Sequence, residues 1–471
     1  MKWTVGTLRY TWPGLLMLFF WLLLGDFSWT MRERSVTPMS QWYLNNIQVP
    51  NLLFGLLISS LPALITLTFG PIISVKSDRH RGKYGRRIPY LLIVTPIGAL
   101  AMIGMGLTPI LASWMHELLT EKALGLWLHR QLDVFTWGEF MLGLIQNKMV
   151  VSVCLFAVCW SAFEFSAVAG QAIFGGLIND VVPRSLLGRF YGLFRAVSLI
   201  DGIIFNFWIM GWVPTHFTWI MVIVGVFYGV SFMFVCLKVK EGEYPPPPTE
   251  EEGGQGPLRK FWRETTRYCR ECFSHKYYVC VFLLMSVATL AFAPVNIYAI
   301  PQAASLGIDM ATFGKALAAI FFVSLCLSYF IGWLADLVHP LRMLVVIMVL
   351  YSLATLYGVV CEKTAHSFLV LWILHGVISG CYYTSTASLG QRLFPHSKYA
   401  QFASAAGILG AIGTMFVGPA VGLVVDWRGN NYVYTFATGC MLAVLATVLG
   451  LYVYKRFLKL GGHQNYRPPE V

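Results

Sequence analysis

The sequence predicts an all-α polytopic membrane protein, with twelve transmembrane helices in two pseudo-symmetric six-helix bundles. Hydrophobic residues make up 57% of its 471 residues and charged residues only 12%. An ordinary soluble domain has about a quarter of its residues charged. Apolar segments recur along the chain, each close to the ~20 residues that a helix needs to cross a bilayer, and basic residues gather between them. Together these observations exclude a soluble fold.

Hydropathy, with glycine, proline and charge as punctuation, gives six apolar segments in each half of the chain. The first six cover residues 12–36, 50–73, 88–112, 149–178, 187–210 and 216–238, and the second six cover 276–300, 311–334, 341–360, 367–391, 399–425 and 431–455. We therefore expect an N-terminal six-helix bundle at 1–240, a cytoplasmic linker at 241–275 and a C-terminal six-helix bundle at 276–471. The first segment lacks a small-residue cleavage site, so we expect it to be retained as a helix.

Basic residues orient these helices, because short cytoplasmic loops carry an excess of lysine and arginine. On one side lie Lys76 to Arg87, Arg184, Arg189, Lys238 to Lys276, Arg342, Arg392, Lys398 and Lys455 to Lys459. We assign this side to the cytoplasm, which places both termini there. The net charge of +12 then follows from topology, and no nucleic-acid partner is expected.

Three segments outside the apolar ones have compositions that predict a linker or a surface helix. Pro245 to Pro248 and Glu250 to Gly254 cannot bury a core, which predicts a mobile linker. Beyond them, apolar residues recur from Leu258 to Cys272 at helical spacing with basic residues between them, which predicts a helix lying on the inner membrane surface. The external segment 113–148 mixes both charge signs and includes Leu126 and Trp127, which predicts an interfacial helix.

No motif points to a metal, a cofactor or an enzyme. Cys269, Cys272 and His275 have the spacing of a metal clip, but a zinc site wants a second ligand pair. The chain contains no Gly-x-x-x-x-Gly-Lys-Ser/Thr motif, so nucleotide-driven pumping is unsupported. It also has no clustered acid, base or metal constellation in a loop, as an integral membrane enzyme would need. A non-transporting receptor stays open as an alternative, which flux measurements would separate from a carrier.

The loop at 77–87 reads Ser-Asp-Arg-His-Arg-Gly-Lys-Tyr-Gly-Arg-Arg, with six basic residues against Asp78. A similar pattern, with Asp336 followed by Arg342, closes the eighth apolar segment as Asp78 closes the second. The same position in both halves favours an internal repeat.

This loop resembles the signature of the major facilitator superfamily, Gly-x-x-x-Asp-Arg/Lys-x-Gly-Arg-Arg/Lys, with Ser74 in place of the leading glycine. Ser77-Asp78-Arg79 and Gly85-Arg86-Arg87-Ile88-Pro89 are similar to the glycoside-pentoside-hexuronide cation symporters and the sucrose-proton symporters. The resemblance implies a major facilitator fold, with two bundles rocking about a midplane site. We expect a conformational latch against the opposite half, made of Asp78, Arg79, Gly85, Arg86, Arg87 and Asp336. The second apolar segment contains no Asp or Glu, which disfavours sodium coupling of the melibiose type.

Charged residues within apolar segments are the candidates for ion coupling, because each costs at least ~2.5–3.5 kcal/mol at mid-bilayer without a partner or water. The candidates for proton coupling are Asp26, Glu33, Arg34, Glu164, Arg195 and Asp201. For Arg32-Glu33-Arg34 two interpretations stay open: a charged gate of a central cavity, or a stretch in external water beyond the end of the first helix. For the buried carboxylates the alternative is a static ion pair.

The second half is poor in charge but rich in neutral hydrogen-bonding and aromatic groups, which is the chemistry that binds sugars. The candidate substrate-binding residues are Gln171, Asn206, Asn296, Tyr298, Gln302, Trp372, His375, Tyr382 and Tyr383. A packed core role is the alternative for His375.

The sequence therefore favours a secondary active transporter that moves a sugar or glycoside by proton-coupled symport with alternating access. The alternative is proton-coupled export of drug-like compounds or metabolites. The expected partners are a small solute, protons and the lipid bilayer, and we expect a functional monomer. We expect it in the plasma membrane, which is the inner membrane if the source is bacterial.

Overall fold

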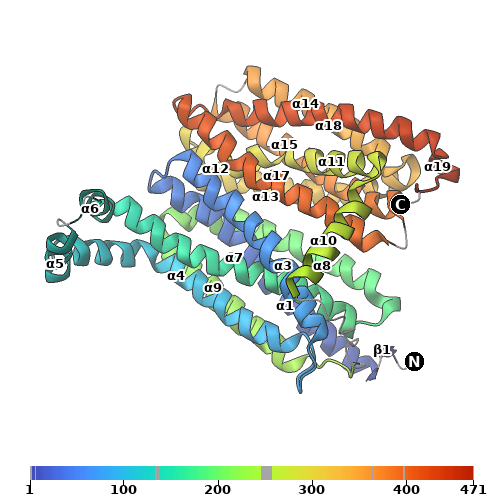
Figure 1. Ribbon diagram of the computed structural model, residues 1–471, viewed down its shortest axis with the longest axis horizontal. Coiled ribbons are helices and arrows are strands. Elements are labelled where there is room, and N and C mark those ends of the chain that lie inside the picture. Colours follow the sequence, from blue (N-terminus) through green and yellow to red (C-terminus); the bar gives the residue numbers. More distant parts are fainter. Residues whose placement is uncertain are drawn as a thin grey trace. The chain divides into compact units, whose positions relative to one another are not determined.

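The computed structural model describes residues 3–5, 7–132, 135, 137–244, 257–361, 364–395 and 398–469. It is almost entirely helical (Figure 1), and the chain separates into two compact units, Met1–Pro247 and Pro248–Val471. The all-α prediction is confirmed. The proline and glutamate run predicted as a mobile linker, Pro245 to Pro248 and Glu250 to Gly254, lies outside the described residues.

The first unit opens with a short hairpin, β1 (Trp3–Val5) and β2 (Leu8–Tyr10), which the sequence analysis did not predict. Its helices are α1 (Trp12–Asn46), α2 (Asn51–Gly55), α3 (Leu61–Arg79), α4 (Ile88–Thr120), α5 (Ala123–Leu132), α6 (Gly138–Gln146), α7 (Lys148–Val181), α8 (Leu187–Ile204) and α9 (Val213–Lys238). A π-turn at Leu56–Ser60 joins α2 to α3 without a break in the chain direction. We call the end with residues 80–87 the inner end, following the predicted topology.

The second unit contains the remaining helices. They are α10 (Pro257–Phe273), α11 (Lys276–Leu290), α12 (Ala293–Ser305), α13 (Met310–Val338), α14 (Pro340–Cys361), α15 (Ala365–Thr386), α16 (Leu389–Leu393), α17 (Tyr399–Trp427), α18 (Val433–Lys459) and α19 (Gly462–Asn465). The predicted segment 276–300 is two helices, since α11 ends at Leu290 and α12 begins at Ala293.

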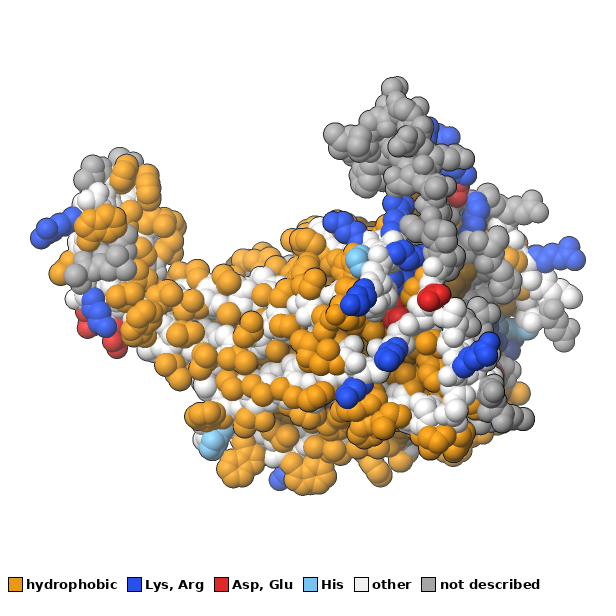
Figure 2. All heavy atoms as spheres, turned by 90° about the horizontal axis from the view of Figure 1, so that it is seen from below, with side chains coloured by type: hydrophobic (Ala, Val, Ile, Leu, Met, Phe, Trp, Pro, Cys, Tyr) orange, Lys and Arg blue, Asp and Glu red, His pale blue; other side chains and the backbone are white. Residues whose placement is uncertain are grey.

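Eleven helical stretches of the described chain are long and apolar enough to span a membrane. One of them, Phe190–Lys238, has 49 residues and would be about 74 Å long as a single helix, more than twice the ~30 Å hydrocarbon core. A π-turn at Phe205–Ile209 and a 3₁₀ turn at Met210–Trp212 divide it between α8 and α9. Counted as two crossings, this stretch gives the predicted twelve. Hydrophobic side chains cover most of the face shown in Figure 2, as expected for a surface in contact with lipid.

Several helices run further than hydropathy predicted. α1 was predicted to end near residue 36 but continues to Asn46, with Pro38 inside it. α4 was predicted to end near residue 112 and continues to Thr120. Hydropathy falls at these points because polar residues begin, but a helix can continue past the hydrocarbon with its backbone hydrogen bonds intact. The predicted external segment forms the short helices α5 and α6.

The helix predicted after the linker forms as α10 and docks on α17. The Tyr268 hydroxyl donates to the Gln401 carbonyl (3.2 Å), and Glu271 accepts from the Gln401 amide (3.1 Å) and pairs with Lys398 (3.4 Å). A hydrogen bond from Arg267, with those from Gln401 and Lys398, lowers the pKa of Glu271 to about 2. α10 is thus held to the second unit by polar contacts, and its contact with the membrane surface stays a prediction.

Candidate functional site

The buried charges of the first unit meet where α1 packs on α8. Asp201 of α8 is 0% exposed, and neither of its carboxylate oxygens has a hydrogen-bond partner among the described residues. Arg34 of α1 interacts electrostatically with Asp201 and with Arg195. Its Nη2 also donates to the Ser198 hydroxyl (3.3 Å). A buried carboxylate of α8 therefore lies near a cation of α1, and this cation also contacts a serine of α8.

Two further carboxylates join this group through α1 and α7. Asp26 and Glu33 lie seven residues apart on α1, two turns along one face, and the charge of each acts on the other. Asp26 is buried and also interacts with Asp201, whereas Glu33 is exposed. Glu164 of α7 interacts with Glu33. The structure thus brings the six predicted coupling residues into one electrostatically connected group, which we call the α1 charge cluster.

Arg32 is a buried cation that the sequence analysis did not select. Its side chain is 2% exposed, and its guanidinium carbon lies 3.8 Å from the ring centroid of Trp29, 4.9 Å from that of Tyr228 and 5.2 Å from that of Phe163. Aromatic faces attract a cation, and more so away from water. Glu164 supplies the opposite charge.

The position of Arg32 corrects one interpretation of Arg32-Glu33-Arg34. The helix does not end before the triplet, and the Arg32 side chain packs inside the unit, so the placement of the whole triplet in external water is wrong. Trp29 could have indicated from the sequence that Arg32 is buried, because it precedes Arg32 by one helical turn and lies on the same face of the helix.

In the second unit a polar network surrounds His375. Its Nδ1 lies 2.9 Å from the Tyr351 hydroxyl and its Nε2 lies 3.0 Å from the Asn296 Oδ1. The Trp372 indole stacks on the imidazole, with ring centroids 5.3 Å apart and planes within 11°. Its buried Nε1 has no hydrogen-bond partner in the described part of the chain. Three predicted substrate residues therefore lie together, and the sequence analysis missed Tyr351.

Three other predicted substrate residues are buried, and their polar atoms already make contacts within the second unit. Tyr298 donates to the Gly418 carbonyl (2.8 Å), Gln302 accepts from Thr435 (3.2 Å) and Tyr382 lies 3.3 Å from the Thr289 hydroxyl. All three are buried, so their polar groups serve the packing of their own unit.

The remaining members of the predicted set are one buried residue and three exposed ones. Asn206 is buried, and its side-chain amide donates to the Gly202 carbonyl (2.7 Å) of the same helix. Gln171, Asn296 and Tyr383 are exposed. Exposure leaves these three able to meet a solute. Trp372 is buried, and its indole N–H has no hydrogen-bond partner in the described residues.

Three of the predicted latch residues, Asp78, Arg86 and Arg87, take part in a dense ionic network at the inner end. Arg86 donates to both carboxylate oxygens of Asp180, at 3.0 and 2.6 Å. Arg87 contacts Asp180 (3.3 Å), the Ser77 hydroxyl (2.8 Å) and Asp78 (2.5 Å). Asp180 lies in the last turn of α7 and is a partner that the sequence analysis missed.

Glu241 completes the network by capping α4. Its carboxylate accepts the backbone N–H groups of Arg86 (3.0 Å), Arg87 (2.8 Å) and Ile88 (2.7 Å), where the helix begins and negative charge is favourable. Gly85 has φ 98°, and a Cβ there would lie 2.6 Å from the Glu241 carboxyl carbon. Glycine is therefore required at position 85 both by its backbone conformation and by the close approach of Glu241.

The recorded partners of Arg86 and Arg87 all belong to the first unit, so in this structure the network fastens α3, α4, α7 and the segment after α9 to one another. The predicted counterpart in the second unit is a pair between Asp336 and Arg392 (2.5 Å), with Asp336 75% exposed. Arg342, the basic residue of the sequence echo, instead donates to the Tyr454 hydroxyl. The motif that repeats in the second unit therefore forms an exposed ion pair and not a second buried network.

Comparisons with known proteins agree with this architecture. A family described as MFS/sugar transport protein matches residues 22–300, and one described as Major Facilitator Superfamily matches residues 278–464. No curated protein sequence matches the chain.

Solved structures are similar over nearly the whole chain at low sequence identity. A bacterial homologue of the human lysosomal transporter Spinster is 14% identical, with a TM-score of 0.66 over 98% of this chain and 100% of that one. A D-xylose-proton symporter is 11% identical, with a TM-score of 0.63 over 94% and 98%. A nucleoside transporter is 11% identical, with a TM-score of 0.60 over 93% and 99%. At such identities the likeness shows the fold alone.

Proposed function

This chain belongs to the major facilitator superfamily, and from that premise we propose that it carries a sugar or glycoside across the membrane together with protons. It is an integral membrane transporter of small solutes and not an enzyme. The observation that carries the proposal of proton coupling is the α1 charge cluster, in which the buried carboxylate Asp201 interacts with both Arg34 and the buried carboxylate Asp26.

Proton coupling needs a group whose charge changes the balance between two conformations. Asp26 and Asp201 each have a carboxylate oxygen without a hydrogen-bond partner in the described residues, so neither is locked into a static network. When Asp201 is charged it attracts Arg34, and when it is protonated this attraction is lost; the charge of Asp26 acts on Asp201 in turn. A proton that binds one conformation better than the other shifts the population toward it. Asp26 and Glu164 are the proposed loading sites, and Arg34 and Arg195 the alternating cations.

A sugar is the proposed solute because of the neutral groups of the second unit. Asn296 and Tyr383 are exposed near the network of His375, and the buried Trp372 indole in that network has an N–H without a hydrogen-bond partner in the described residues. Sugars are recognised by ring faces and by amide and hydroxyl groups in this way. The match to the MFS/sugar transport family and the likeness to a D-xylose-proton symporter support the same class. Within the superfamily, we propose the glycoside-pentoside-hexuronide or sucrose-proton branch.

The remaining assignments complete the proposal. The protein acts as a monomer in the plasma membrane. Both of its termini lie in the cytoplasm, as the positions of the basic loops predict. The inner-end network of Asp78, Arg86, Arg87, Asp180 and Glu241 stabilises one of the two conformations, so its loss changes the balance of states.

Uptake into liposomes tests the proposed function. Purified protein is reconstituted and given a panel of mono- and disaccharides under an inward proton gradient, with protein-free liposomes as the control. At least one sugar should accumulate above its external concentration, and a protonophore should abolish this accumulation. If no sugar accumulates while amphiphilic drug-like compounds move against a proton gradient, the export alternative replaces the proposal.

Replacing Trp372 with phenylalanine should weaken sugar binding about tenfold, in addition to the loss of sugar-free stability that the smaller buried ring causes. The aromatic stack is retained, but the N–H that would bond a sugar oxygen is lost, and one such bond is worth about 1–1.5 kcal/mol. Binding is measured by sugar-dependent thermal stabilisation. Trp333→Phe, at an exposed tryptophan of α13, is the matched control and should bind as the wild type does. Equal affinity of Trp372→Phe and the wild type would remove Trp372 from the substrate site.

A further inference from the structure

Arg32 is a buried cation of α1 that the transport mechanism leaves without a role. Three aromatic side chains surround it, Trp29 of α1, Phe163 of α7 and Tyr228 of α9, with ring centroids 3.8 to 5.2 Å from its guanidinium carbon. We call these three side chains the aromatic cage. Aromatic faces attract a cation, and the attraction is stronger here because Arg32 is only 2% exposed.

The wall of the cage at Trp29 is held in place by close packing. A Cβ at Gly170 of α7 would lie 2.6 Å from the Trp29 ring, so the indole occupies space that a larger residue would need. The same indole contacts the rings of Phe174 and Phe232, with centroids 6.2 and 5.7 Å away. The cage therefore has a fixed shape that is built from three helices.

The cage attracts Arg32 but does not satisfy its hydrogen bonds. Its Nε and Nη1 are buried and have no hydrogen-bond partner among the described residues. Buried donors without a partner are unfavourable, and the planar fork of a guanidinium is suited to a carboxylate. Arg32 is therefore not committed to the cage, and a charged carboxylate nearby would compete for it.

Glu164 of α7 is such a carboxylate. It follows Phe163 of the cage directly in the chain, and its charge interacts with that of Arg32. In the part of the chain that the structure describes, the other charged group that acts on Glu164 is Glu33, also of α1. The helices α3 and α4 pack against α7 as well, but no described charge of theirs acts on Glu164. Arg32 is thus the cation placed to respond when Glu164 changes its charge.

We propose that Arg32 is a positioning residue for the coupled proton and exchanges between two partners. It pairs with the Glu164 carboxylate when that group is charged and returns to the aromatic cage when Glu164 is protonated. The cage then stabilises a buried cation that would otherwise be left without compensation. This proposal rests on the role of Glu164 as a proton-loading site, which is part of the proposed function.

The exchange predicts opposite effects for the two partners of Arg32. Without Arg32, the charged form of Glu164 loses its cation, so Glu164 keeps its proton up to a higher pH. With a weaker cage, Arg32 is freer to pair with Glu164, so Glu164 loses its proton at a lower pH. An arginine with only a structural role would change the unfolding temperature and produce neither shift.

Carbodiimide labelling of the full-length protein in detergent tests the proposal without a transported solute. Dicyclohexylcarbodiimide reacts with protonated carboxyl groups in apolar surroundings, and mass spectrometry of the peptides follows Glu164 across a pH series. The pH of half-maximal labelling should rise by about one unit in Arg32→Gln. It should fall by about half a unit in Phe163→Leu, which keeps the arginine and removes one ring of the cage.

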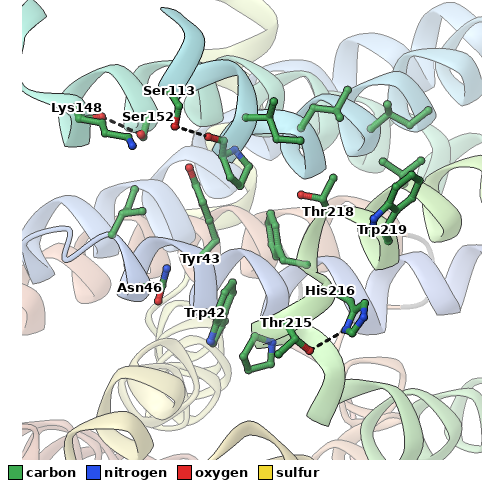
Figure 3. A pocket seen from close by; sticks show the side chains of 18 residues that line it. Trp42, Tyr43, Asn46, Ser113, Lys148, Ser152, Thr215, His216, Thr218 and Trp219 are labelled. Carbon is green, nitrogen blue, oxygen red and sulfur yellow. Dashed lines mark hydrogen bonds between the residues drawn. The ribbon is translucent and has the colours of Figure 1, made fainter. Parts of the chain in front are cut away.

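Two matched controls lie outside the cage. Phe217 of α9 is 5% exposed, close to the 4% of Phe163. It lines a pocket of about 680 Å³ together with Trp42 (Figure 3), and none of the described residues of that lining is an arginine. Arg428 is exposed, and its guanidinium carbon lies 4.6 Å from the Trp427 ring centroid. Phe217→Leu and Arg428→Gln should both label Glu164 as the wild type does.

The outcomes separate this proposal from the proposed function. Identical labelling curves for the wild type and Arg32→Gln would overturn it, because Glu164 would then not depend on Arg32. An unchanged or higher pH of half-maximal labelling in Phe163→Leu would also overturn it, because the cage would then not compete for the cation. No labelling of Glu164 in the wild type at any pH would overturn the loading role of Glu164, and this proposal with it.

Discussion

Replacing Asp180 with alanine should lower the free energy of unfolding by about 3 kcal/mol, because it removes one partner from a largely buried charge network. Asp180 holds the guanidinium groups of Arg86 and Arg87, and the Arg87 side chain is only 10% exposed. Without the carboxylate, the Arg86 guanidinium would lose its ion pair with Asp180, and that of Arg87 would keep its ion pair with Asp78. Thermal unfolding in detergent, with a fluorescent thiol probe, measures the change.

The second unit offers a matched control for this prediction. Asp336 pairs with Arg392 at a distance similar to that between Asp180 and Arg86, but Asp336 is 75% exposed. Exposed ion pairs contribute about 0–1 kcal/mol, so Asp336→Ala should change the unfolding temperature little. If both variants unfold at the same temperature, the burial of the first network does not determine its contribution and the argument fails.

Replacing Asp26 with asparagine should abolish sugar accumulation driven by a pH gradient while preserving exchange of labelled for unlabelled sugar. An amide has nearly the shape of the carboxylic acid but cannot bind and release a proton. The carrier could then still change conformation, but the proton gradient would no longer bias it. Reconstituted liposomes measure both activities in the same preparation.

Glu164→Gln should give the same separation of activities, because Glu164 is the second proposed loading site. Glu139→Gln, at an exposed carboxylate of α6, is the control and should retain accumulation. Full accumulation in both Asp26→Asn and Glu164→Gln would show that neither carboxylate carries the coupled proton. Loss of exchange together with accumulation would instead indicate a structural ion pair, the alternative that the sequence left open.

The comparison between sequence and structure is clearest on α1. Hydropathy located the helix and identified Asp26 as a charge inside it, because both follow from the local composition of one segment. It did not locate the end of the helix, because polar residues beyond the hydrocarbon continue the same backbone hydrogen bonds to Asn46. It also did not identify Arg32 as buried, because the aromatic rings that surround Arg32 come from α1, α7 and α9.

The sequence by itself determined the membrane class, the twelve crossings and the family, since each depends on the composition of short windows or on one loop motif. Only the tertiary structure decided which charges meet. Arg86 and Asp180 are 94 residues apart in the chain, and Arg86 and Glu241 are 155 apart. Such contacts depend on how each helix is rotated about its axis and on which helix packs beside it. Hydropathy averages over both, so the partners Asp180, Glu241 and Tyr351 became visible only once the helices were packed.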